Sequence, residues 1–360
     1  MTSRSEHTSA NRRAIEGSPS HLGPLSEEII LGMLNTPIQR PNLIMQHPLF
    51  SQGVILPTLP INEIYQQIRR SVYIRESGRC FKAPSGSGKS FCIDMICDLL
   101  KHDFPNLAVI KIQAQTQMVA SIRSFFKHIL TSLRHNDIRG ETYDLKRRAM
   151  NRLVDEAKRH GMSFVVLFID EAQCMRTEDY YFLKDVSNGL STEGVQLVTV
   201  LFGQAPEFEY AINDLRSAGK LDIVSRFTMR LEDFRPFSTL ADIEQLFEQI
   251  EKATYPAHTN ISWIQFLSPK SYAAGFRFKN EARPFFEALT SLNIDDESPF
   301  FPARSMFLAL RHALFDFAVS ESVQLQIPPS AWVNAIQYAQ VIEAARIGGM
   351  PQDSKWEVKK

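Results

Sequence analysis

The chain has 360 residues, a length that suits about two domains, and its 44% hydrophobic content is ordinary for a globular protein. Its 40 basic and 40 acidic side chains cancel, so a surface for nucleic acid would have to be a local patch. No apolar run reaches the roughly 18–20 residues that span a bilayer, and the polar N-terminus has no signal-peptide core. We therefore expect a cytoplasmic protein without membrane contact.

The beginning of the chain is polar and then rich in proline. Residues 1–35 open with a run of Ser, Thr, Asn, Arg and Gly that cannot bury a core, which predicts a mobile segment. Five prolines recur through residues 36–60, a spacing typical of an extended strap over a domain surface. The expected anchors of this strap are Leu43, Phe50, Val54 and Leu56. A helix over residues 62–75 should follow.

Strand-like and helix-like patterns then alternate up to residue 237. The run 164–169 is continuously apolar, as a strand buried on both faces requires, and residues 143–160 carry an apolar side chain every four positions, as a packed helix does. The predicted strands are 79–83, 108–114, 164–169, 195–202 and 227–234, and the predicted helices are 88–100, 119–133, 143–160 and 180–190. This alternation predicts an α/β core, residues 36–237 with the strap, whose parallel sheet is flanked by helices.

Beyond residue 237 the pattern becomes helical throughout. Helices are predicted over residues 240–250, 281–292, 305–319 and 329–346, with no buried strand between them. We expect a small all-helical lid domain over residues 238–347, followed by a flexible tail over 348–360.

A phosphate-binding loop follows the first predicted strand. Residues 83–90 read Ala-Pro-Ser-Gly-Ser-Gly-Lys-Ser and match the Walker A pattern Gly-x4-Gly-Lys-Ser/Thr except at Ala83, which ends the strand. Lys89 should reach the β- and γ-phosphates and the Ser90 hydroxyl should bind Mg²⁺, while glycines let backbone N–H groups face phosphate. The residues expected to bind ATP are Pro84, Ser85, Gly86, Ser87, Gly88, Lys89 and Ser90. The predicted cofactors are ATP and Mg²⁺.

Two carboxylates end the apolar strand at 164–169. Asp170 is expected to hold Mg²⁺, directly or through water, as a Walker B aspartate does. Glu171 suits activation of an attacking water, although a solvated charge is an alternative. Because a kinase phosphorylates another hydroxyl and needs no such base, the Asp-Glu pair favours hydrolysis over phosphoryl transfer.

A polar side chain follows the apolar strand at 195–202. In ATPases of this class the strand beside Walker B delivers a polar side chain to the γ-phosphate. Gln204 is the first such side chain past the apolar run, and Thr199 in mid-strand is its competitor.

Two arginines stand where they could contact nucleotide. Arg226 precedes the last predicted strand and could act as an arginine finger on a neighbouring subunit, with Arg216 and Arg230 as rivals. Arg304 opens the lid helix 305–319 and could report the state of the γ-phosphate, with Arg311 as its rival. A surface salt bridge is the alternative role for Arg226.

The stretch 121–148 is the most basic part of the chain. It holds seven Lys and Arg side chains against three acidic ones, and it lies between predicted core strands. It could line a pore that follows a phosphate backbone, or it could be a solvated helix face. The candidate DNA contacts are Arg123, Lys127 and Arg147.

These motifs resemble the AAA+ superfamily and, within it, the TnsC/TniB group of transposition regulators, some of which serve CRISPR-associated transposons. The likeness covers roughly residues 40–345. It rests on the proline-rich strap, the Walker A loop, Phe-Ile-Asp-Glu-Ala-Gln, Leu-Phe-Gly-Gln-Ala-Pro-Glu, Ser-Arg-Phe and the compact lid. Lys89, Ser90, Asp170 and Glu171 carry over from the family's motifs, as do Arg226 and Arg304, whereas Ala83 departs from them.

The resemblance implies an ATPase that assembles as a ring or filament on duplex DNA without sequence preference. Such proteins link a target-selection protein of the TniQ/TnsD type to the transposase. Another AAA+ switch, either origin-binding or secretion-associated, is the alternative, and a small-molecule kinase is a third reading that Glu171 and the lid oppose. The absence of a helix-turn-helix or winged-helix signal after residue 345 disfavours the origin-binding form.

Overall fold

The computed structural model describes residues 25–36, 38–50, 56–116, 121–159, 161–256, 258–292, 300–320 and 322–349. These fall into two compact units. One, which we call the sheet unit, is Glu63–Arg235, and the other, the helical unit, combines described residues of Met1–Asn62 with Pro236–Met350. Within the described ranges, no helix is long and apolar enough to cross a membrane.

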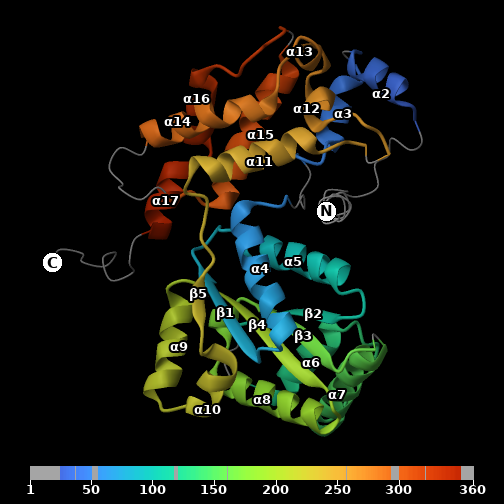
Figure 1. The fold of residues 1–360 in the computed structure, drawn as a ribbon, viewed down its shortest axis with the longest axis vertical. Helices are drawn as coiled ribbons and strands as arrows, with labels where there is room; N and C mark the ends of the chain where they lie inside the picture. The colour runs from blue at the N-terminus through green and yellow to red at the C-terminus, as the bar shows by residue number, and fades with distance from the viewer. Residues whose placement is uncertain are drawn as a thin grey trace, which may run out of the picture. The chain divides into compact units, whose positions relative to one another are not determined.

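The sheet unit contains five parallel strands in the order β2-β3-β4-β1-β5 (Figure 1). Every residue of β3 is buried, which explains its unbroken apolar sequence. The strands are β1 (Gly78–Ala83), β2 (Ala108–Gln113), β3 (Phe164–Asp170), β4 (Gln196–Gln204) and β5 (Leu231–Asp233). Because all five run in one direction, the loops that follow them emerge at the same edge.

Helices cover both faces of this sheet. α4 (Leu59–Ile74) and α5 (Lys89–Asp103) lie on one face, and Figure 1 shows the other helices on the opposite face. Those helices are α6 (Ile122–Ser132), α7 (Thr142–Arg159), α8 (Thr177–Thr192) and α9 (Glu207–Ser217). Side chains alternate between the two layers: Cys80 and Leu201 pack with α6–α9, while the rings of the following residues, Phe81 and Phe202, lie 5.1 Å apart. The expected α/β fold with a parallel sheet flanked by helices is confirmed.

The last predicted strand is wrong in its first half. Residues Val224–Thr228 form a π-helix after the short helix α10 (Leu221–Ile223), and only Leu231–Asp233 is extended. Phe227 and Thr228 are buried at this turn. The apolar pattern therefore indicated correctly that these residues are buried. A helical turn buries them as well as a strand would.

The helical unit contains no sheet among its described residues. Its helices beyond residue 236 are α11 (Leu240–Lys252), α12 (Trp263–Leu267), α13 (Pro269–Ala273), α14 (Ala282–Leu292), α15 (Ala303–Val319), α16 (Pro329–Tyr338) and α17 (Val341–Gly349). The single helix expected over 329–346 is two helices, because the chain turns at Gln340, whose φ is +50°. Phe247 and Trp332 lie in the aromatic core of this unit.

The start of the chain departs from the extended strap and mobile segment that the sequence predicts. Glu27–Leu34 forms α2 and Arg40–Gln46 forms α3, which lie beside α12 and α13 in Figure 1. Pro41 stands in the first turn of α3, where a missing N–H costs nothing, so it begins a helix instead of preventing one.

Buried side chains attach these helices to the helical unit. Ile30, Leu34 and two of the predicted anchors, Leu43 and Leu56, belong to its core, and Phe50 packs against that core. Arg40 donates hydrogen bonds to the carbonyls of Leu267 and Ala318. The segment therefore groups with the helical unit and not with the sheet unit; Val54 lies outside the described residues.

His47 is a fully buried histidine at the end of α3. Its ring centroid lies 5.1 Å from that of Trp263, 5.4 Å from Phe266 and 5.5 Å from Tyr255. Nδ1 accepts a hydrogen bond from the Leu49 N–H at 3.2 Å, and no described residue pairs with Nε2. Burial in this aromatic cage lowers the pKa of His47 to about 3, because charging the ring would cost its hydration.

This shift predicts a loss of stability in acid. Below pH 6.5 the unfolded chain takes up a proton at His47 and the folded chain does not, so the free energy of unfolding falls as the pH is lowered toward 3. The site alone should contribute a loss of about 2 kcal/mol between pH 7 and pH 5. His47→Phe should abolish this contribution to the loss of unfolding free energy and leave the contribution of the other titrating groups. Urea unfolding at the two pH values measures it.

A matched control is His258→Phe, which removes an exposed histidine of the same unit and should keep the wild-type difference. If wild type and His47→Phe lost the same free energy of unfolding between pH 7 and pH 5, His47 would not be the source of the loss.

Candidate nucleotide-binding site

The loop after β1 has the geometry of a phosphate cradle. Gly86 and Gly88 adopt φ of +77° and +86°, which side chains other than glycine rarely tolerate. Gly88 is the N-cap of α5, so the helix begins at the loop and points its positive end toward it. The Ser87 hydroxyl donates to the Pro84 carbonyl at 2.9 Å and fixes the turn. The loop predicted from the sequence therefore has the backbone shape that binds phosphate.

Lys89 is buried at the start of α5. Its ammonium lies 3.3 Å from the Pro84 carbonyl oxygen and 3.5 Å from that of Ala83. Burial lowers the pKa of Lys89, while the carboxylates of Glu171, Asp170 and Glu207 act in the opposite direction. The ammonium is thus held by the loop itself, in a position from which it can turn to the oxygens of a bound phosphate.

The Walker B carboxylates meet this loop from the end of β3. The Ser90 hydroxyl donates to Asp170 Oδ2 at 2.6 Å, so the two predicted magnesium ligands are in direct contact. Asp170 is buried, and its Oδ1 accepts the N–H of Glu171 at 2.9 Å. One hydroxyl and one carboxylate beside the phosphate loop are the oxygen ligands that Mg²⁺ takes together with phosphate and water. The residues present therefore fit a magnesium–nucleotide complex.

Gln204 is the last residue of β4 and lies next to the loop. It is paired in register with Ala83, and the N–H of the following residue, Ala205, donates to the Ala83 carbonyl at 2.9 Å. The rival Thr199 is fully buried near the opposite end of the sheet, where its hydroxyl donates to the Ser77 carbonyl at 3.0 Å. The structure thus brings Gln204, and not Thr199, to the phosphate loop.

Gln173 is a site residue that the sequence reading missed. Its side-chain amide donates to Glu171 Oε2 and accepts from the N–H of Gln204, at 2.9 Å in the second case. Gln173 ends the segment Phe-Ile-Asp-Glu-Ala-Gln, two residues after Glu171, but this position in the sequence does not indicate a contact with Gln204.

Arg226 lies in the π-helix and donates to Asn188 Oδ1 on α8 at 2.7 Å. Its two rivals are engaged elsewhere: Arg216 reaches the Thr228 carbonyl at 3.4 Å, and Arg230 lies 3.4 Å from Glu76. To contact another subunit, Arg226 would therefore have to give up its hydrogen bond to Asn188. Its role as a finger stays a prediction.

The remaining predicted residues lie on helices other than the one that begins at the loop. Arg304, exposed, and Arg311, half-buried, are on α15 of the helical unit, and burial lowers the pKa of Arg311. Arg123 and Lys127 lie on α6, and Arg147 lies on α7, 3.7 Å from Asp144. Their roles stay predictions.

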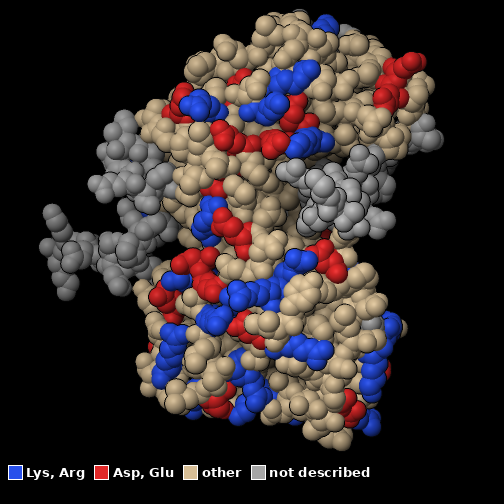
Figure 2. All heavy atoms as spheres, in the orientation of Figure 1, with Lys and Arg blue, Asp and Glu red and all other residues tan. Residues whose placement is uncertain are grey.

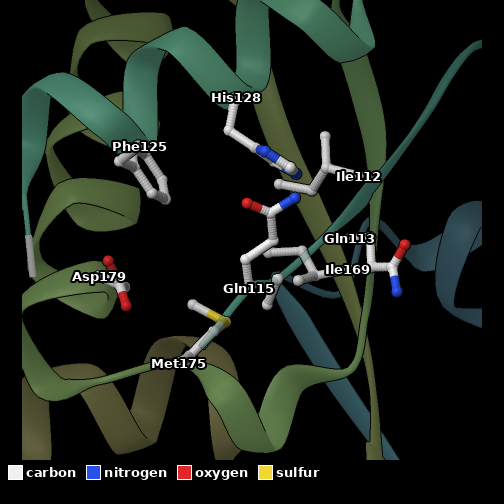
Figure 3. Close-up of a pocket in the computed structure, with 9 residues that line it drawn as sticks. Ile112, Gln113, Gln115, Phe125, His128, Ile169, Met175 and Asp179 are labelled. Atoms are coloured by element: carbon white, nitrogen blue, oxygen red, sulfur yellow. The ribbon is translucent and has the colours of Figure 1, made fainter. Parts of the chain in front are cut away.

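A separate small pocket opens at the carboxyl end of β2 (Figure 3). Gln115 points into it toward His128, whereas Gln113 points away. Met175 and Asp179 line it from another segment, and burial raises the pKa of Asp179. None of the residues that line this pocket is Lys or Arg. It is therefore a poor site for phosphate, and the loop at 84–90 is the better one.

Comparison with known families agrees with this geometry. The family model of the AAA domain matches residues 80–211, a range that holds the phosphate loop, both Walker B carboxylates and Gln204. The chain carries an AAA ATPase domain. It binds and hydrolyses nucleotide. The comparison with curated proteins found no match.

Several solved structures resemble it at low sequence identity. The ORC1 protein of Aeropyrum pernix in complex with DNA is 14% identical, with a TM-score of 0.45 over 81% of this chain and 68% of that one. Drosophila ORC bound to DNA is 15% identical, with a TM-score of 0.45 over 93% and 72%. Domain III of the replication initiation protein DnaA from Thermotoga maritima is 14% identical, with a TM-score of 0.42 over 80% and 94%.

Lys89→Ala should reduce ATP affinity by at least about 100-fold, because the β- and γ-phosphates lose a charge-assisted partner in a partly buried site. Titration with a fluorescent ATP analogue measures the effect. Lys101→Ala is the matched control, since Lys101 is an exposed lysine on the same helix and should leave affinity unchanged. Unaltered binding by Lys89→Ala would remove this lysine from the phosphate site.

Proposed function

We propose that this protein is a nucleotide-switched AAA ATPase that assembles on duplex DNA and regulates transposition. In this role it links a target-selection protein of the TniQ/TnsD type to transposase subunits. The motifs that resemble TnsC/TniB support the transposition role. The observation that carries DNA binding is a pair of unengaged cations on α6.

Arg123 and Lys127 are four residues apart and so lie on the same face of α6. Among the residues that the structure describes, neither forms an ion pair, whereas nearby Lys146 and Arg148 are paired with Asp185 and Asp137 at 3.0 and 3.1 Å. Figure 2 shows basic side chains at the edge of the sheet unit where α7 lies, and others over the rest of that face among acidic ones. Unpaired cations can bind phosphate without first giving up a protein partner.

The proposed chemistry assigns one task to each residue of the site. Ser90 and Asp170 hold Mg²⁺, and Lys89 holds the β- and γ-phosphates. Glu171 accepts a proton from the attacking water. Gln204 contacts the γ-phosphate in its own subunit, Arg226 contacts the ATP of a neighbour, and Arg304 reports nucleotide state from the helical unit. Assembly into a ring or filament would complete each site.

DNA binding should be electrostatic, nearly independent of sequence and dependent on ATP, since one subunit offers few cations and an assembly multiplies them. Combining Arg123→Gln, Lys127→Gln and Arg147→Gln should flatten the plot of log affinity against log salt by about 0.9 for each phosphate that the variant no longer neutralises. ATP affinity should not change. Fluorescence anisotropy with a non-hydrolysable ATP analogue and random duplexes measures this.

The control removes the same charge outside the 121–148 stretch, with Lys101→Gln, Lys252→Gln and Lys279→Gln. This variant should keep the wild-type salt slope. Salt-independent binding, or equal binding without nucleotide, would overturn the proposal and favour another AAA switch.

Arg226 should serve an adjacent subunit. Arg226→Ala and Lys89→Ala should each lose hydrolysis alone, and a mixture should recover part of it, because some interfaces then pair an intact loop with an intact arginine. Steady-state ATPase across mixing ratios gives the answer. Arg230→Ala, which removes the neighbouring arginine paired with Glu76, should remain active by itself. Assembly without recovery at any ratio would count against a finger in trans.

A further inference from the structure

Gln173 connects two functional strands through a single side chain. Its Nε2 donates to the Glu171 carboxylate at the end of β3, and its Oε1 accepts the N–H of Gln204 at the end of β4. The chain segment that carries it, the 3-10 helix Ala172–Cys174, begins directly after Glu171. One amide therefore joins the proposed base to the strand that borders the phosphate loop.

The polarity of the two bonds fixes the orientation of this amide. A carboxylate only accepts hydrogen bonds and a backbone N–H only donates, so the amide must place its nitrogen on Glu171 and its oxygen on Gln204. Turned by 180°, it would face oxygen with oxygen and N–H with N–H. The bridge thus has one allowed arrangement, in which the carboxylate is held from a defined side.

The Gln204 N–H is available because of the strand register. β3 and β4 are paired up to Ile169 and Leu201, and β3 ends one residue later at Asp170. Gln204 lies beyond that end, so no β3 carbonyl can accept its N–H. Gln173 supplies the missing acceptor. The Gln204 N–H is half-buried and would lack a strand partner without Gln173, so its hydrogen bond to Gln173 stabilises the bridge.

The backbone at Glu171 adds to this control. Glu171 has φ of +56° and ψ of +38°, a left-handed conformation that is uncommon for a residue with a side chain. Its carbonyl accepts the Cys174 N–H at 2.9 Å, which closes the 3-10 turn that carries Gln173. Backbone and side chain therefore act together on the direction of the carboxylate.

We propose that Gln173 is a positioning residue that aims Glu171 at the attacking water and ties that aim to the position of β4. The inference rests on the proposed role of Glu171 as the base. Gln173 itself touches neither water nor phosphate in this scheme. When β4 moves relative to β3, the amide moves with it, so the efficiency of the base follows the strand that contacts the γ-phosphate.

The test is single-turnover hydrolysis with assembled protein in excess over ATP, alongside ATP affinity. Gln173→Ala should keep ATP affinity within about twofold and slow hydrolysis by about 10- to 100-fold, because a misplaced base loses alignment while the phosphates keep their partners. The matched control is Gln196→Ala. Gln196 lies at the opposite end of β4, where it donates to the Arg75 carbonyl at 3.0 Å, and its loss should leave the rate unchanged.

Gln173→Glu gives a signature that a structural role would not produce. When protonated, the new carboxyl can donate to Glu171 and accept from Gln204 as the amide does; when ionised, it repels Glu171. Its rate relative to wild type should therefore rise as the pH is lowered from 8.5 to 6. Because this series compares Gln173→Glu with wild type at each pH, it stays valid even if Gln173→Ala lowers stability.

Glu171→Gln, measured in parallel, separates the two ideas. If it retains full hydrolysis, the base assignment fails and the positioning role fails with it. If it is inactive while Gln173→Ala hydrolyses at the wild-type rate, or the pH ratio of Gln173→Glu is flat, the base assignment stands and only the role of Gln173 is overturned.

Discussion

Parallel pairing of β4 between β1 and β3 is the constraint on which the nucleotide site depends. β1 delivers the phosphate loop, β3 delivers Asp170 and Glu171, and β4 delivers Gln204, and parallel order brings all three to one edge. The register is fixed locally: Ala205 bonds the Ala83 carbonyl, and Ala114 at the end of β2 bonds that of Asp170 at 2.8 Å. A shift of one residue would turn every strand side chain to the other face, which both buried layers forbid.

Electrostatics then sets what this edge can bind. A buried lysine faces three carboxylates, those of Glu171, Asp170 and Glu207, so the group carries a net negative charge. These acids would repel phosphate alone, whereas phosphate with a divalent cation would not be repelled if Asp170 and Ser90 serve as the predicted ligands of that cation. The site thus suits a magnesium–nucleotide complex better than a free anion. Lys89 meanwhile rests on the loop carbonyls at 3.3 and 3.5 Å.

Sequence predicted those features that a short run of residues determines. The phosphate loop depends on two glycines and a helix start, and the buried strands on unbroken apolar runs, so both were found. The prediction of an extended strap was wrong because Pro41 can begin a helix as readily as it can extend a chain. The prediction of a strand over 227–234 was wrong in its first half because Phe227 is buried in a π-helix. Gln173 was missed because its bond to Gln204 depends on where β3 ends relative to β4, which spacing along the chain does not reveal.

β1 also connects the nucleotide loop to the segment that carries Arg226. A Cβ at Gly78 would lie 2.4 Å from the Arg226 carbonyl oxygen, so only glycine lets the π-helix approach the strand this closely. Two residues on, the Cys80 thiol donates to the Phe227 carbonyl at 3.1 Å and the Cys80 N–H donates to that of Arg230 at 3.0 Å. The first half of β1 is therefore bonded to residues 226–230, and the phosphate loop follows the last residue of the same strand. The subunit contact proposed at Arg226 and the phosphate loop of the same chain would therefore be joined through one strand, β1.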